Sequence, residues 1–430
     1  MATAAARKTG MARVRVTLWI LLTVYVFNFI DRQIVNILAE PIARDLELSD
    51  TQIGLMTGLA FALFYTVLGI PIARLADRQT TSRPRLIATA LALWSGMTAL
   101  CGLAQNFPQL LLARIGVGVG EAGCTPPAHS LISDIVPAEK RASALAFYSL
   151  GIPIGTLLGM IIGGTLADRM GWREAFVIVG LPGVMLALIV WFLLKDPRRA
   201  DAAAVLRAQG QPVAMPLGQA VGDVMRSRAF LLLLLAGSSA SFLAYGKTTW
   251  TTIFFQRTHD LTPGQVGLWF GLAGGIAGMI GTWAGGYLAD RFGATARRHV
   301  LSAPAIGMAL AVPIAIAAYQ APSWQIALVL LFVPTMLNSL YYGPCYSAAQ
   351  GLVPIKARAI AAATLLFFQN LIGLGLGPLF FGILSDWLHP AYGADSVRYV
   401  LYGAAVLGLV PAFCFWRCSL RLDAELDRKG

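Results

Sequence analysis

The fold is decided by the stretch LLLARIGVGVGEAGCTP, residues 110–126, which lies inside an apolar segment long enough to cross a bilayer. Arg114 and Glu121 are seven residues apart, about two helical turns, so their side chains share one helix face roughly 10 Å apart along the axis. Ionisable groups in such a segment normally face a protein interior or a water-filled path. The glycines between and after them allow a neighbouring helix or a ligand to approach closely. We therefore expect a buried charged site on this helix.

Composition indicates an integral membrane protein. The chain has 430 residues, of which 57% are hydrophobic and only 13% are charged, and its mean hydropathy is +0.68. Soluble proteins average about 25% charged residues, so a soluble multidomain protein is a poor interpretation. The net charge of +12 does not indicate nucleic acid binding, because the basic residues lie in short loops between apolar spans. The expected surroundings are membrane lipids, with no nucleic acid partner.

Nothing in the sequence indicates an enzyme or a bound cofactor. The five cysteines fall mostly within apolar spans and lack the spacing of metal ligands. No stretch matches a nucleotide-binding loop of the G-x-x-x-x-G-K-[ST] type. The loops contain no nucleophile with a neighbouring base and no pair of carboxylates. We therefore expect no catalytic residues, no metal and no cofactor.

Twelve apolar runs can each cross a bilayer as a helix. The first six lie near residues 16–38, 52–75, 85–105, 108–131, 142–167 and 174–194, and the second six near 229–255, 265–288, 299–319, 324–348, 358–384 and 397–418. A polar interruption from Lys195 to Arg228 separates the two sets. The sequence predicts an all-α membrane protein of twelve transmembrane helices in two pseudo-symmetric six-helix bundles, residues 1–195 and 229–430, joined by a cytoplasmic linker, 196–228.

The basic residues predict the orientation of these helices. With the N-terminus inside, 25 of the 33 lysines and arginines fall in inner segments. Three lie inside spans, and the outer segments hold only Arg44, Arg169, Arg173, Arg257 and Arg398. Because positive residues are retained on the cytoplasmic side, both termini are expected in the cytoplasm.

The two halves share a repeated loop. Leu-Ala-Asp77-Arg78 after the second span reappears as Leu-Ala-Asp290-Arg291 after the eighth, 213 residues later, and each copy is followed by basic residues. Two related six-helix halves with a site at their interface form a transporter architecture. The paired aspartates and arginines are candidates for a conformational latch that holds the two halves together in one state. The other interpretation is a chance match between positively charged inner loops.

Polar residues in the first span complement those of the fourth. Asn28, Asp31 and Arg32 lie at a depth similar to that of Arg114. Glu121 lies about two turns deeper and is expected to exchange a proton near neutral pH, because burial disfavours the charged form of a carboxyl group. Asp31 and Glu121 are therefore proton-site candidates. Arg114 can pair with either acid or with an anionic substrate group; in the other interpretation these residues only tie two helices together.

Lys247 in the seventh span is a further candidate. It lies 216 residues after Asp31, near the repeat-related position, where it is able to complement that aspartate or a substrate from the other half. The competing interpretation is a lysine whose ammonium group extends to the outer membrane interface.

Together these motifs resemble the major facilitator superfamily. More narrowly, NFIDR at residues 28–32, GVGEA at 118–122 and FYSLGIPIG at 147–155 look like the spinster branch. The resemblance implies a rocker-switch transporter of amphipathic lipids such as lysophospholipids or sphingolipids. It also implies that Asp31 and Glu121 are proton sites and that Arg32 and Arg114 are their partners or headgroup ligands.

We therefore expect a secondary active transporter of an amphipathic, lipid-like substrate that works by alternating access, with protons as a candidate coupling ion. One alternative is a transporter of a small organic anion or a drug, and another is a passive lipid scramblase or a membrane sensor. The expected setting is the inner membrane of a bacterium, as a multi-pass monomer.

Overall fold

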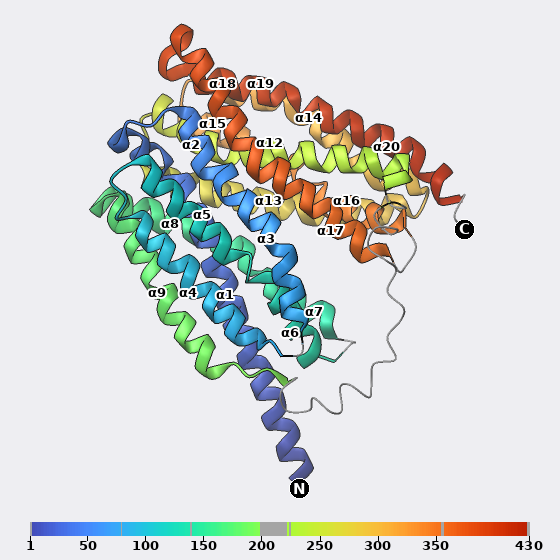
Figure 1. The fold of residues 1–430 in the computed structure, drawn as a ribbon. Coiled ribbons are helices and arrows are strands. Elements are labelled where there is room, and N and C mark those ends of the chain that lie inside the picture. The colour runs from blue at the N-terminus through green and yellow to red at the C-terminus, as the bar shows by residue number, and fades with distance from the viewer. Residues whose placement is uncertain are drawn as a thin grey trace. The chain divides into compact units, whose positions relative to one another are not determined.

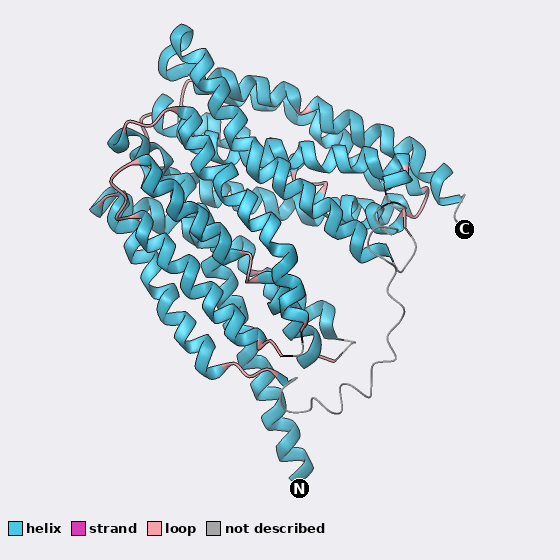
Figure 2. Cartoon of the chain, viewed as in Figure 1, coloured by secondary structure: helices cyan, strands magenta, loops and turns pink. Residues whose placement is uncertain are grey.

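The described part of the chain is mostly helical. The computed structural model describes residues 2–78, 80–137, 140–197, 222, 225–353 and 357–427, and in these ranges helices are joined by short loops, with no strand (Figure 2). A segment surrounded by lipid has to satisfy its backbone N–H and C=O groups internally, which a helix does. The predicted all-α class is confirmed.

Each of the twelve predicted spans coincides with one helix or with consecutive helices. Ten helical stretches of the described chain are long and apolar enough to cross a membrane by themselves. The longest, Ile360–Leu422, contains the last two predicted spans. The fourth predicted span is not among the ten because its helix is interrupted at residues 122–124, just before Pro126 and Pro127. A proline inside a helix removes one backbone donor and favours such a break.

The surface is that of a protein in lipid. Phe192, Trp283 and Trp387 are 74%, 71% and 75% exposed, respectively. They belong to a large set of exposed apolar side chains. Soluble monomers rarely expose so many large apolar side chains on their surface. These side chains are placed to face acyl chains.

Contacts between helices divide the chain into two compact units. The first unit comprises Met1–Leu46 and Ala60–Gly210, and the second comprises Glu47–Leu59 and Gln211–Gly430. The segment Glu47–Leu59, which lies within the predicted first bundle, belongs to the second unit. The predicted bundle boundaries stay a prediction. The predicted linker, 196–228, lies mostly outside the described residues.

The first unit contains eight helices in the described ranges (Figure 1). They are α1 (Ala2–Leu46), α3 (Ala60–Asp77), α4 (Arg83–Cys101), α5 (Phe107–Glu121), α6 (Thr125–Ile135), α7 (Arg141–Ser149), α8 (Gly151–Met170) and α9 (Trp172–Leu193).

The second unit begins with the short helix α2 (Asp50–Gly54) and a π-helical turn, η1 (Leu55–Leu59). It continues with α12 (Arg228–Thr258), α13 (Pro263–Gly293), η4 (Arg297–Leu301), α14 (Ser302–Tyr319), α15 (Trp324–Asn338), α16 (Tyr342–Gly351), α17 (Arg358–Phe368), η6 (Gln369–Leu376), α18 (Gly377–Tyr392), η7 (Gly393–Asp395), α19 (Ser396–Leu407) and α20 (Leu409–Asp427).

Glycines hold α8 against α1 in the first unit. Gly151, Gly155, Gly159 and Gly163 recur every four residues and therefore form one smooth face of α8. A Cβ added at Gly155 would lie only 2.4 Å from the backbone oxygen of Val26, and the other three glycines also face α1 at close range. This face of α8 therefore serves close packing against α1.

Two π-helical turns pack against each other in the second unit. An added Cβ at Gly58 in η1 would lie 2.7 Å from the backbone oxygen of Gly375 in η6. One at Gly54 in α2 would lie 2.4 Å from the backbone oxygen of Pro378 in α18. The backbones therefore touch, and this close approach explains why the segment from Asp50 to Leu59 belongs to the second unit.

We predict that Gly155→Leu separates α8 from α1. The added side chain has to displace the backbone of Val26, and overpacking of this kind destabilises proteins by roughly 1–3 kcal/mol. The expected result is a lower thermal unfolding midpoint of the detergent-solubilised protein. Gly69→Leu in α3 is the matched control, because nothing lies within 4 Å of a Cβ added there. Equal midpoints for the two variants would refute this account of the packing.

Candidate functional site

Glycines of α5 bring α3 and α4 to the site helix. A Cβ added at Gly118 would lie 2.6 Å from the backbone oxygen of Phe61 in α3. One added at Gly120 would lie 2.6 Å from the backbone nitrogen of Trp94 in α4. The alternating glycines of the stretch 110–126 therefore serve helix packing, and they place Phe61 and Trp94 beside the charged residues of α5.

A buried ion pair joins α1 to α5. The Nε atom of Arg32 donates to Oε2 of Glu121 over 2.6 Å. The Glu121 side chain is fully buried, whereas 13% of the Arg32 side chain is exposed. Of the two arginines considered as partners of the acids, Arg32 of α1 makes the direct hydrogen bond to Glu121. The partner of Arg114, for which either acid or a substrate anion was considered, stays a prediction.

Aromatic rings surround the Arg32 guanidinium group. Its central carbon lies 5.0 Å from the ring centroid of Phe29, 5.1 Å from that of Phe61 and 4.4 Å from that of Tyr65. The guanidinium of Arg114 lies 5.4 Å from the Phe61 centroid, so the two arginines share this ring. Each distance is within the range of a cation–π interaction.

The remaining polar groups of this site are buried and lack partners. Arg114 is 1% exposed, and its Nε and Nη1 atoms have no hydrogen-bond acceptor in the part of the chain that the structure describes. The same holds for both carboxylate oxygens of Asp31, both amide atoms of Asn28 and Oε1 of Glu121. Most buried polar atoms in proteins are paired, so this concentration indicates a place where water or a ligand completes the bonding.

The site also contains polar residues of α4 that we did not select from the sequence. The indole nitrogen of Trp94 and the hydroxyl group of Thr98 face the carboxylate of Asp31. The hydroxyl group of Ser95 has no hydrogen-bond partner within the described ranges. The sequence signal for these residues was the presence of polar side chains one and three residues apart within an otherwise apolar span. These residues place hydrogen-bonding groups on a third helix next to the two acids.

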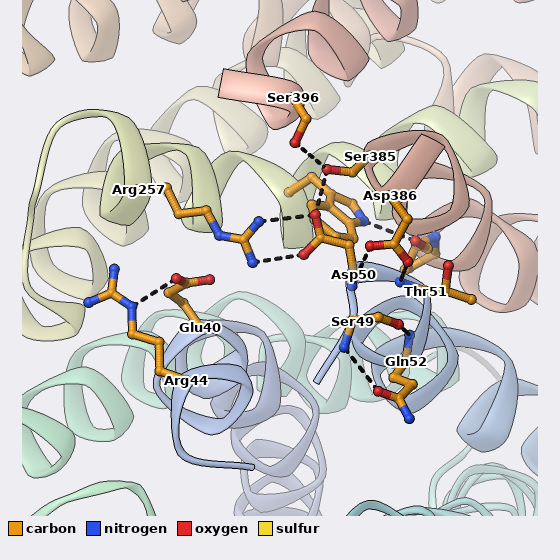
Figure 3. Close-up of polar contacts among 12 residues, drawn as sticks. Glu40, Arg44, Ser49, Asp50, Thr51, Gln52, Arg257, Ser385, Asp386 and Ser396 are labelled. Atoms are coloured by element: carbon orange, nitrogen blue, oxygen red, sulfur yellow. Dashed lines mark hydrogen bonds and ion pairs between the residues drawn. The ribbon is translucent and has the colours of Figure 1, made fainter. Parts of the chain in front are cut away.

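A second polar cluster lies in the other unit and holds the start of α2. The two terminal nitrogens of Arg257 donate to the two carboxylate oxygens of Asp50 over 2.8 and 3.0 Å, and Ser385 donates to the same carboxylate (Figure 3). Asp386 accepts from the backbone N–H groups of Asp50 and Thr51 over 3.0 and 2.8 Å. An aspartate at this end of a helix satisfies free backbone donors. We call these residues the Asp50 clamp; the sequence analysis had not selected them.

A third polar cluster joins three segments of the first unit through Arg83. Arg83 at the start of α4 is fully buried and pairs with Asp196 and Asp134, with 2.6 Å between the charged atoms in each case. Its backbone N–H also donates to Asp196 over 2.9 Å. Among the basic residues after the second span, Arg83 is buried. Its ion pairs join the beginning of α4 to the end of α6 and to the segment after α9.

Comparison with known proteins identifies the family. The model of the Major Facilitator Superfamily matches residues 21–371. The chain belongs to the major facilitator superfamily. Its members are multi-pass membrane transporters of small molecules, and bacterial homologues are among the relatives of this chain.

The similar proteins include both efflux pumps and spinster proteins. The chain is 34% identical to an MFS-type efflux pump of Mycolicibacterium smegmatis over 98% of its own length and 96% of that protein. It is 27% identical to mouse Protein spinster homolog 1, over 98% of this chain and 84% of that protein.

A solved structure of a bacterial homologue of the human lysosomal transporter spinster, in an inward-facing and unoccupied conformation, matches with a TM-score of 0.86. It is 30% identical, and the match covers 96% of this chain and 98% of that one. The same homologue in an occupied conformation matches with a TM-score of 0.82. The transporter therefore has a spinster-like fold, as the sequence motifs predicted.

The predicted latch residues lie at the ends of two helices, one helix in each unit. Asp77, Arg78, Asp290 and Arg291 are exposed at the ends of α3 and α13. Arg291 donates to the hydroxyl of Tyr287 on its own helix over 3.1 Å. Their role as a latch stays a prediction.

Lys247 is half-buried in α12. The role of Lys247 also stays a prediction.

We predict that Asp50→Asn destabilises the transporter much more than Asp45→Asn. Both aspartates pair with an arginine, but Asp50 is 5% exposed, whereas the side chains of Asp45 and its partner Arg173 are 44% and 38% exposed. Removal of one charge from a buried pair costs about 3–5 kcal/mol, and an exposed pair contributes about 0–1 kcal/mol. Thermal unfolding in detergent measures the difference. Similar midpoints would show that the Asp50 clamp contributes little to stability.

Proposed function

We propose that the chain is a secondary active transporter that moves an amphipathic, lipid-like substrate across the cytoplasmic membrane by alternating access, coupled to protons. The observation that supports this most is the Arg32–Glu121 ion pair beside the unpartnered Arg114. Spinster-like structure and the length of the apolar spans are consistent with it. Both termini in the cytoplasm, an inner-membrane setting and a monomeric state belong to the same proposal.

Glu121 carries the proton in this mechanism. Its carboxylate is fully buried and is held by a single charged hydrogen bond from Arg32. Protonation removes the negative charge, and the attraction that ties α1 to α5 is then lost. When one partner of a buried ion pair loses its charge, the other charge is left without compensation, which is energetically costly. Binding of one proton is therefore sufficient to shift the equilibrium between two conformations of the unit.

Arg114 binds the substrate headgroup in this mechanism. The planar guanidinium fits a phosphate or carboxylate with two parallel hydrogen bonds, and two of its nitrogens have no acceptor among the described residues. Asp31 lies near Arg114. When Asp31 is ionised and no substrate is bound, its carboxylate balances the charge of this arginine. An anionic headgroup competes with this acid for the arginine.

A second candidate function is the efflux of drugs. The relative of highest identity reported above is an MFS-type efflux pump, and it matches nearly the whole chain. Transport assays in proteoliposomes with a fluorescent lysolipid, a short carboxylate and a lipophilic drug separate the possibilities. Accumulation of the lysolipid against its gradient supports the proposal and excludes a passive scramblase, and transport of only the drug supports the second candidate.

We predict that Glu121→Gln abolishes the pH dependence of lysolipid transport. Glutamine resembles the protonated acid, so the variant should behave at every pH as the wild type does at low pH. Initial transport rates between pH 5 and pH 8 provide the measurement. Glu40→Gln is the matched control, since Glu40 is a buried acid of α1 that pairs with Arg44 outside the site. A pH profile of Glu121→Gln that matches the wild type would remove Glu121 as the proton site.

We predict that Arg114→Ala weakens lysolipid binding at least tenfold and that Arg114→Lys restores part of the loss. Lysine keeps the charge but lacks the planar pair of donors. Binding to the purified protein is the measurement. Arg44→Ala serves as the control, because the Arg44 side chain is 66% exposed and pairs with Glu40 of its own helix. Wild-type affinity in Arg114→Ala would reduce this arginine to a tie between helices.

A further inference from the structure

The rings around Arg32 form a receptor for a cation. Phe29 comes from α1, and Phe61 and Tyr65 come from α3; all three ring centroids lie 4.4 to 5.1 Å from the guanidinium carbon. The carboxylate of Glu121 closes the receptor at 2.6 Å. Aromatic rings around a positive charge are a common way to bind ligand cations whose charge is spread over a large group. In this transporter the position is occupied by a side chain of the protein.

The rings are held in place independently of Arg32. Phe61 and Tyr65 are stacked, with centroids 5.4 Å apart and planes 15° apart. Phe61 is 1% exposed, and its backbone contacts Gly118. Phe29 packs edge-on against Tyr25 at 5.2 Å. The cage therefore does not need its present occupant to keep its shape.

Part of the cage is exposed. Phe29 and Tyr65 are half-buried, and 13% of the Arg32 side chain is exposed, whereas Glu121 and Phe61 are fully covered. Arg32 has a long and flexible side chain, so it is able to leave the rings without movement of the α1 backbone. A ligand that enters from the exposed side meets the rings first and the carboxylate last.

We propose that Phe29, Phe61, Tyr65 and Glu121 bind the cationic group of a lipophilic substrate, and that Arg32 occupies this site as an internal competitor. The substrate class is a monocation with a weakly hydrated charge, such as a quaternary ammonium or phosphonium group with apolar substituents. This inference rests on the proposed function, because it uses the same transporter site, but it concerns a cation and not the anionic headgroup assigned to Arg114.

Charge balance explains why Arg32 has to give way. When both acids are ionised, Arg32 and Arg114 offset Asp31 and Glu121, and the cluster of four charged residues is neutral. An incoming cation adds a positive charge and needs the carboxylate that Arg32 now holds. Removal of the Arg32 charge should therefore favour binding of the cation, whereas loss of a merely structural arginine would not.

The test is equilibrium binding of tetraphenylphosphonium to the full-length protein purified in detergent. We expect weak binding to the wild type and binding at least fivefold tighter to Arg32→Gln. Within that variant, Tyr65→Ala should weaken binding at least tenfold, and Tyr65→Phe, which keeps the ring, should stay within about threefold. The anion tetraphenylborate, which has the same shape, should not respond to Tyr65→Ala in this way. Size-exclusion profiles and unfolding midpoints verify that each variant is folded.

Two outcomes would overturn the proposal: Arg32→Gln binds the phosphonium no better than the wild type, or Tyr65→Ala leaves its binding unchanged. Should Arg32→Gln fail to fold, Tyr65→Ala and Tyr65→Phe are compared in the wild-type background. Weaker phosphonium binding by Tyr65→Ala than by Tyr65→Phe supports the proposal, and equal binding overturns it. Lysolipid transport that persists without phosphonium binding would refute the cage and leave the proposed function intact. Phosphonium binding in the cage without any lysolipid transport would refute the proposed function and leave the cage.

Discussion

The first unit depends on how it accommodates four charged residues in a segment surrounded by lipid. Arg32, Arg114, Asp31 and Glu121 are buried or nearly so, and only one pair among them makes a direct hydrogen bond. Isolated charges in such surroundings are strongly disfavoured, and buried ion pairs add little stability compared with apolar residues of similar size. A cluster of this kind is therefore better explained by a process that needs its charges than by the requirements of folding.

Glycine makes the cluster possible. Because Gly118 and Gly120 have no side chains, α3 and α4 approach the backbone of α5 and bring Phe61 and Trp94 to the charged groups. The glycine face of α8 does the same for α1, which carries Asp31 and Arg32. The polar residues thus lie on helices whose separations are set by close backbone contact. Small residues at such positions replace the hydrophobic driving force that is absent between helices in lipid.

In the second unit, close backbone contact at glycines holds the segment Asp50–Leu59 in place. The π-helical turns η1 and η6 touch through Gly58, and the Asp50 clamp holds the beginning of α2 with charged groups from α12 and α18. Short π-helical turns often occur at functional positions because they leave backbone groups less regularly paired than in an α-helix. Here one such turn ends at the residue where the chain passes from the second unit back to the first.

The sequence by itself determined the helical class, the positions of twelve spans, the family and the helix face shared by Arg114 and Glu121. These properties follow from apolar run length and from a period of 3.6 residues, which are local. Only the tertiary structure decided that Glu121 pairs with Arg32, that Phe29, Phe61 and Tyr65 enclose this arginine, and that Asp50 and Arg83 are held by buried partners. Those contacts join residues from different helices, and their geometry depends on the rotation and separation of helices that no local pattern specifies.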